Sequence, residues 1–137
     1  QHFSAIAINA VKELSTDGIS TFSFIKNIET AYTAADIIIS RAGAIAISEL
    51  CVIGKPVILI PSPNVAENHQ FKNAQSLVNK NAALLVKDSQ ANDKLVLKII
   101  SLKNDSQLMK ELSVNIKTME AKDASSIIAS HAMSLIK

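Results

Sequence analysis

The sequence predicts an α/β fold in which helices flank a parallel sheet, and two observations lead to this prediction. Short apolar runs bounded by turn residues alternate along the chain with longer segments of helical period. The runs lack polar alternation, which is typical of strands buried on both faces of a parallel sheet. Three such runs are expected to be strands, at 37–39, 57–60 and 83–86.

The remaining elements follow from periodicity and turn chemistry. An amphipathic helix is predicted over 4–14, and loose alternation over 19–25 predicts a further short strand. Other helices are expected at 29–35, from Gly43 to about Ile53, at 67–79, at 91–102 and, with a break near 122–126, over 106–136. Gly54 and Pro56 end the helix that starts at Gly43, because glycine suits a left-handed C-cap and proline cannot continue a helix.

The apolar positions of the C-terminal segment predict a pair of packing helices. These positions are Leu108, Leu112, Ile116, Met119, Ile127, Ile128 and Met133. Its basic and acidic residues balance, which argues against a helix that lies on a membrane surface.

Composition narrows the class of protein. With 137 residues, 48% of them hydrophobic and 19% charged, the chain is long and apolar enough for one globular domain with a sizeable core. A net charge of +2 and the lack of basic residues interleaved with aromatics argue against nucleic acid as a partner. The single cysteine, Cys51, excludes an internal disulfide and agrees with a cytoplasmic location. We expect its thiol to be buried in the core.

The turn from the 37–39 run into the next helix is the most informative stretch. A buried strand that enters a helix through a tight turn of small residues leaves backbone N–H groups unpaired at the helix start, where they suit an anion such as phosphate. Gly43 lets a ligand approach the backbone closely. The candidate donors are the N–H groups of Gly43, Ala44, Ile45 and Ala46. A turn that merely needs a small residue explains the pattern equally well.

Two charged residues flank this turn. Glu49 offers two carboxylate oxygens to the neighbouring hydroxyls of a ribose, although a surface acid near a helix N-terminus is the commoner role. Arg41 either neutralises phosphate charge or forms a structural ion pair with Asp36 or Glu49. Together with the turn, these residues point to a sugar-nucleotide site.

The loop after the 57–60 run is proline-stiffened and rich in side-chain amides. Because ligands of parallel sheets sit at the carboxyl ends of the strands, we expect loops 40–44 and 61–70 to lie at the same edge. The groups suited to sugar hydroxyls are Asn68, His69, Gln70 and Asn73. The alternative is a plain helix start capped by Asn64 or Glu67.

His69 is a weak candidate for chemistry. It has no partnered Asp or Ser for acid–base catalysis and no Cys or His at the spacing of a metal site. Neither catalysis by His69 nor a metal is therefore expected.

In order and spacing, these motifs resemble the MurG family, the N-acetylglucosaminyltransferases that convert lipid I to lipid II in peptidoglycan synthesis. The resemblance rests on Phe24-Ile25, Ala34-Ala-Asp-Ile-Ile-Ile-Ser-Arg-Ala-Gly-Ala44, Ser48-Glu49-Leu50, Gly54-Lys55-Pro56 and Glu67-Asn68-His69-Gln70. It runs from about residue 19 to the C-terminus and is specific through residue 86.

The resemblance implies a Rossmann-like domain, the C-terminal half of a GT-B glycosyltransferase. Residues 1–137 would then be a single UDP-sugar-binding domain, with C-terminal helices over 106–137. The implied donor is UDP-GlcNAc, and no metal or other cofactor is implied.

By position, the family assigns roles to residues of this chain. Phe24 and Ile25 would flank uracil, the backbone of residues 43–46 would hold the diphosphate, and Glu49 would bind the ribose. His69 and Gln70 stand where the family has a Gln-Gln pair facing the sugar, and Gln70 is the safer assignment because His69 departs from that pair.

The remaining implications concern the whole enzyme. The general base, the lipid I contacts and the membrane contacts belong to the acceptor domain in this family, so no catalytic residue is expected in this chain and no transfer by it alone. The full enzyme is expected in the cytoplasm, peripheral to the inner face of the bacterial membrane.

Two departures leave alternatives open. Residues 1–4 replace the family's Gly-Gly-Ser turn, and the stretch between Leu14 and Ile19 is too short for the strand and helix expected there. The alternatives are a UDP-GlcNAc epimerase domain and a non-catalytic nucleotide-binding module, the second of which the lost glycines favour.

Overall fold

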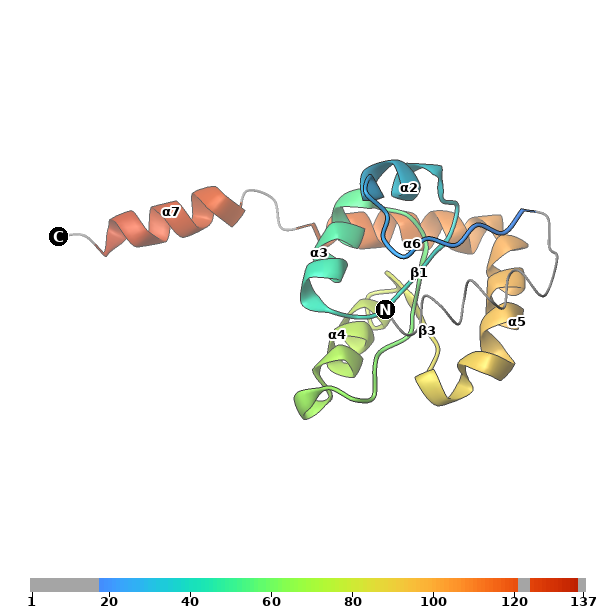
Figure 1. Cartoon of the computed structure of the whole chain (residues 1–137). Helices are drawn as coiled ribbons and strands as arrows, with labels where there is room; N and C mark the ends of the chain where they lie inside the picture. The colour runs from blue at the N-terminus through green and yellow to red at the C-terminus, as the bar shows by residue number, and fades with distance from the viewer. Residues whose placement is uncertain (1–17, 121–123, 136–137) are drawn as a thin grey trace. The chain divides into compact units, whose positions relative to one another are not determined.

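The structure, a computed structural model, describes residues 18–120 and 124–135, and Figure 1 shows their elements. The chain divides into two compact units, residues 1–34 and 35–137. The predicted helix over 4–14 lies outside the described residues. In the first unit, helix α2 (Ile28–Ala34) confirms the helix predicted at 29–35.

Residues 19–25 form no strand, so that prediction is wrong. Loose alternation of apolar residues does not make a strand unless a neighbouring strand accepts and donates the ladder hydrogen bonds. The sheet within the described residues joins only three other segments. Phe22 and Phe24 also remain 69% and 78% exposed, so the segment buries no apolar face.

The second unit contains a three-stranded parallel sheet with strand order β1-β2-β3. The strands are β1 (Ile38–Ser40), β2 (Val57–Leu59) and β3 (Leu84–Leu85), which lie at the three predicted apolar runs. Every residue of β2 is buried. Because successive side chains point to opposite faces, this central strand is covered on both sides, and the predicted fold class is confirmed.

Helices follow each strand (Figure 1). They are α3 (Ala44–Ile53), α4 (His69–Val78), α5 (Ala91–Lys103), α6 (Ser106–Thr118) and α7 (Ala124–Ser134), with short 3-10 helices η1 (Ala66–Asn68) and η2 (Asp88–Gln90). One core cluster joins Ile58 of β2 to Leu102 of α5 and Leu112 of α6. These two helices therefore cover one face of the sheet.

The ends of α3 and α6 follow ordinary capping chemistry. Gly54 adopts a left-handed conformation (φ 68°) and its N–H donates to Leu50 O at 3.0 Å, as predicted for a glycine C-cap. The hydroxyl of Ser113 on α6 donates to Gly54 O, which ties the end of α3 to α6. At the start of α6, Asp105 accepts a hydrogen bond from Leu108 N at 2.9 Å.

The start of α4 differs from the prediction. Glu67 (φ 51°) and Asn68 (φ 54°) are left-handed, so the regular helix begins only at His69. Asn68 is the N-cap and makes no side-chain capping bond, so the alternative in which Asn64 or Glu67 caps this helix does not hold. A left-handed residue cannot continue a right-handed helix, which is why η1 and α4 meet at a kink.

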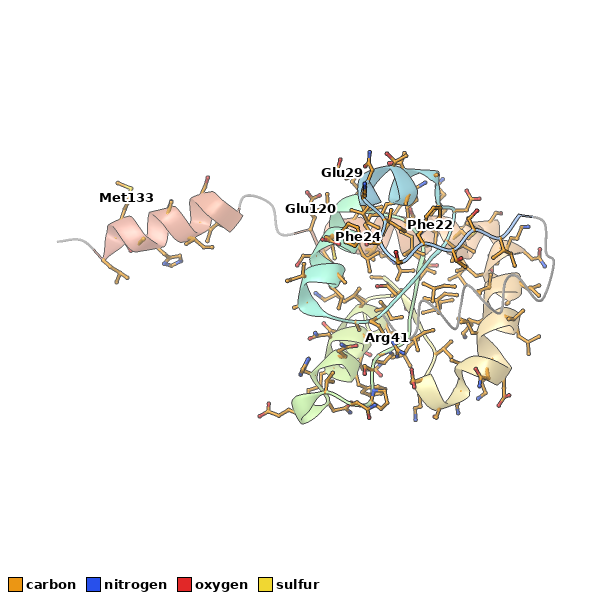
Figure 2. The ribbon with its side chains drawn as sticks, in the orientation of Figure 1. Phe22, Phe24, Glu29, Arg41, Glu120 and Met133 are labelled. Atoms are coloured by element: carbon orange, nitrogen blue, oxygen red, sulfur yellow. The ribbon has the colours of Figure 1, made fainter. Side chains whose placement is uncertain are left out.

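The predicted C-terminal helix pair forms, but only α6 packs as predicted. α6 buries Leu112 and Ile116 completely. On α7, Ile127, Ile128 and Met133 are 56–72% exposed, and Figure 2 labels Met133. The expectation that α7 packs through these residues is therefore wrong for this structure.

Candidate site at the carboxyl edge of the sheet

The segments that follow β1 and β2 lie together, as predicted. Arg41, the residue after β1, donates from Nη1 to the carbonyl oxygen of Ile60, the residue after β2, at 3.1 Å. From α4, the side-chain amide of Asn73 donates to Ala42 O at 3.2 Å. These two bonds hold the 40–44 loop against the residues that flank the 61–70 loop, at one edge of the sheet.

The turn at Gly43 offers both space and hydrogen-bond donors. Gly43 has φ −69° and ψ 149°, a conformation open to any residue, and an added Cβ would meet no atom within 4 Å. The chain itself therefore does not require glycine here, contrary to the interpretation that the turn merely needs a small residue. The α3 ladder begins with Ile47 N donating to Gly43 O, so the N–H groups of residues 44–46 precede it.

Glu49 lies on the same face of α3 as Ile45, which is in the first turn of the helix. Ile45 and Glu49 are four positions apart, so they share a helix face, and both are exposed. Ile45 is 78% exposed at the helix start. Glu49 therefore presents an exposed carboxylate one helical turn from the backbone N–H groups that are predicted to bind the diphosphate.

Arg41 is held by Asp88, a partner that was not predicted from the sequence. Its Nη1 forms an ion pair with the carboxylate of Asp88, from η2 after β3, as well as the hydrogen bond to Ile60 O. The predicted partners were Asp36 and Glu49. Asp88 lies 47 positions away, but it follows the third strand and so meets the same edge of the sheet.

The amides of α4 also bind the loops rather than only facing solvent. Gln70 accepts a hydrogen bond at Oε1 from Ser62 N at 2.9 Å. Asn73 holds Ala42 from the next turn of the helix. His69, the first residue of α4, is exposed, and Gln70 is half-buried.

A cavity of about 370 Å³ opens between the loops after β2 and β3. Its walls are Pro61, Ser62, Pro63, Asn68, Phe71, Lys87, Asp88 and Ser89. Residues 87–89 were not among the predicted site residues, although the rule that ligands bind at strand carboxyl ends applies equally to the third apolar run.

Phe24 and Ile25 lie in the first unit, which has a pocket of its own of about 620 Å³. It is lined by Phe22, Phe24, Ile25, Lys26, Asn27, Thr30, Ala31 and Ala34. Phe22 and Phe24, which Figure 2 labels, are largely exposed residues. Exposed aromatic rings beside a backbone segment without regular structure offer a flat apolar surface for a planar ligand.

Cys51 lies on α3 and is buried, as predicted. Burial, and secondarily the charge of Glu120, raises the pKa of its thiol.

In residues 18–120 and 124–135, no three His, Cys, Asp or Glu side chains are placed to hold a metal ion. No helix in the described part of the chain has the length and apolarity to cross a membrane.

Parallel α/β domains bind their ligands at the carboxyl edge of the sheet, where the Gly43 turn and the polar loops of this chain lie. Residues 1–128 match the family described as "Glycosyltransferase family 28 C-terminal domain". The chain belongs to this family, and the resemblance to MurG proteins is confirmed.

Named relatives and a solved structure agree with this assignment. Proteins named UDP-N-acetylglucosamine--N-acetylmuramyl-(pentapeptide) pyrophosphoryl-undecaprenol N-acetylglucosamine transferase are 51% identical over 112 residues in Phocaeicola vulgatus and 47% identical over 129 residues in Bacteroides thetaiotaomicron. These alignments cover 82% and 94% of this chain. The crystal structure of Acinetobacter baumannii MurG superposes with a TM-score of 0.80 at 25% identity and covers 93% of this chain.

The chain spans about a third of the length of these relatives, 30% and 34% for the two sequences, and 38% of the solved chain.

Proposed function

We propose that this chain is the UDP-GlcNAc-binding domain of an inverting N-acetylglucosaminyltransferase that converts lipid I to lipid II in peptidoglycan synthesis. The observation that carries the proposal is the Gly43 turn, where a glycine that the fold does not need leaves space beside the first N–H groups of α3. The names of the relatives, which are transferases, favour this function over a UDP-GlcNAc epimerase.

The diphosphate and the ribose are assigned to α3. The N–H groups of Gly43, Ala44, Ile45 and Ala46 donate to the diphosphate oxygens, helped by the positive end of the helix dipole. Glu49 accepts hydrogen bonds from the ribose hydroxyls. Arg41 contributes positive charge near the diphosphate while it remains paired with Asp88.

The base and the sugar are assigned to the other loops. Phe24 and Ile25 flank uracil from the first unit. His69 and Gln70 approach the GlcNAc from the start of α4, with Gln70 held by Ser62 N. In this proposal residues 1–137 work as one UDP-sugar-binding domain with C-terminal helices over 106–137.

The domain contributes to transfer by electrostatics and orientation. As the acceptor hydroxyl attacks the anomeric carbon, charge develops on the leaving UDP, and preorganised backbone N–H groups stabilise it without a metal or other cofactor. Glu49 and Gln70 hold the donor so that the anomeric carbon is in line for attack. The catalytic base, the lipid I acceptor site and peripheral contact with the inner face of the cytoplasmic membrane are assigned to another domain of the full enzyme, and nucleic acid is not a partner.

Calorimetric titration of this chain with UDP-GlcNAc tests the proposal, with UDP-glucose and ADP-glucose as controls. Saturable binding that prefers UDP-GlcNAc is the expected result. A folded chain that binds none of the three would contradict the proposed donor site.

A further inference from the structure

The Arg41–Asp88 pair links the segments that follow all three strands of the described sheet. Arg41 follows β1, its Nη1 donates to the carbonyl of Ile60 after β2, and the same nitrogen pairs with Asp88 after β3. The last backbone bonds of the ladder are Ile60 N to Ser40 O at 2.9 Å and Val86 N to Leu59 O at 3.0 Å. The guanidinium group therefore continues the connection across the sheet just beyond the point where the backbone ladder stops.

The position of the Arg41–Asp88 pair suits it to fixing the geometry of the loops more than to raising the free energy of unfolding. The side chains of Arg41 and Asp88 are 56% and 37% exposed, so solvent screens their attraction and the pair adds little to the free energy of unfolding. Arg41 is, however, only two residues before Gly43. Asp88 also forms part of the wall of the cavity between the loops after β2 and β3.

We propose that Asp88 is a positioning residue for donor binding. By holding the Arg41 guanidinium against Ile60 O, it fixes the turn before α3 relative to the loop after β2, so that the N–H groups of residues 44–46 and the amide of Gln70 are presented together. The proposal rests on the proposed function, because it concerns the site for the diphosphate and sugar.

Electrostatics alone predicts the opposite effect of Asp88, which makes the proposal testable. Removing a carboxylate close to a bound diphosphate would tighten binding through charge, because it removes a repulsion and frees the charge of Arg41. Positioning predicts weaker binding, since Arg41 and the turn that follows it lose their fixed place.

The experiment compares the affinities of UDP and uridine, by calorimetry, for wild type, Asp88→Ala and Asp88→Glu. Uridine has no diphosphate, so a defect in the 43–46 turn affects UDP alone, whereas partial unfolding lowers binding of both. We expect Asp88→Ala to weaken UDP binding about three- to tenfold, which lies within the range for coupled neighbours, and to leave uridine binding unchanged. Asp88→Glu keeps the carboxylate and is expected to restore most of the UDP affinity. Glu111→Ala, which removes an exposed carboxylate from α6, is the matched control and should change neither affinity.

Each outcome has a distinct meaning. Unchanged or tighter UDP binding by Asp88→Ala, in a chain whose wild type binds UDP, overturns the positioning role and leaves the donor site in place. Equal weakening of UDP and uridine also overturns it, because the pair would then support the fold alone. Wild type that binds neither ligand refutes the donor site, and the role of Asp88 falls with it.

Discussion

The side-chain amide of Asn73 on α4 donates to the backbone carbonyl of Ala42, one residue before the Gly43 turn, at 3.2 Å. Ala42 is fully buried. A carbonyl that loses its donor in such a place keeps the cost of its desolvation without the hydrogen bond. Asn73 therefore anchors the turn that leads into α3 from the neighbouring helix.

We expect Asn73→Ala to lower the free energy of unfolding by about 1–3 kcal/mol, the usual cost of leaving one such group unsatisfied. Urea denaturation of wild type and of Asn73→Ala measures this change in the free energy of unfolding. Asn92→Ala, an exposed position on α5, is the control for the change in side-chain type. Equal stability of the Asn73 and Asn92 variants would contradict an anchoring role for Asn73.

The strands were predictable because their signal is local. The 57–60 run is apolar at every position, and β2 is buried at every position, so burial on both faces could be inferred from consecutive residues. The 19–25 segment also alternates, but pairing depends on whether another strand lies beside it, which no local pattern contains. The kink before α4 was missed because Glu67 and Asn68 fit the polar start of a helix. Asparagine tolerates a left-handed backbone, but glutamate gives no such signal.

Only the part of the site that depends on a local signal could be predicted. Ile45 and Glu49 belong to one strand-turn-helix unit, so their shared helix face follows from helical spacing. Arg41 and Asp88 are 47 positions apart, and only the order of strands in the sheet brings them together. The same holds for Gln70 and Ser62, whose bond depends on the turn geometry of the intervening loop.

Gly43→Ala is expected to separate stability from binding. The backbone conformation suits alanine and an added Cβ meets nothing within 4 Å, so the free energy of unfolding should stay within about 0.5 kcal/mol of wild type. If the diphosphate lies against this backbone, the methyl group occupies its place and UDP affinity falls about tenfold or more. Urea denaturation and calorimetry on the same samples give both quantities.

Gly54→Ala is the matched comparison, because it should do the reverse. Gly54 is left-handed and an added Cβ lies 3.1 Å from Lys117 Cδ, so alanine is strained at this C-cap and should destabilise the chain by about 1–2 kcal/mol. UDP affinity of the folded fraction should not change. Stability loss at Gly43 similar to that at Gly54 would mean that the fold, and not a ligand, needs glycine at the turn.

The buried thiol of Cys51 makes stability depend on pH in the alkaline range. Burial, and secondarily Glu120, raises the pKa of this thiol above its ordinary value of 9.0, so the folded chain keeps its proton where the unfolded chain loses it. The contribution is fully present below pH 9.0 and is lost as pH rises towards the folded-state pKa. We expect urea denaturation to show a free energy of unfolding that falls above that pH more steeply for wild type than for Cys51→Ala. Identical slopes would mean that Cys51 has the same pKa in both states.

Glu49→Gln tests the ribose assignment at the level of single hydroxyl groups. The exchange keeps the size of the side chain and removes its charge, and hydrogen bonds to a charged group contribute about 1.5–3 kcal/mol, so UDP affinity should fall about tenfold. The informative measurement is the ratio of affinities for UDP and 2′-deoxy-UDP. Wild type should prefer UDP, and Glu49→Gln should lose most of that preference, because the removed hydroxyl and the removed charge belong to the same contact. Glu111→Gln on α6 should keep the wild-type ratio. A Glu49→Gln variant that still distinguishes the two nucleotides as wild type does would place the ribose elsewhere, and the orientation of the whole donor along α3 would have to be revised with it.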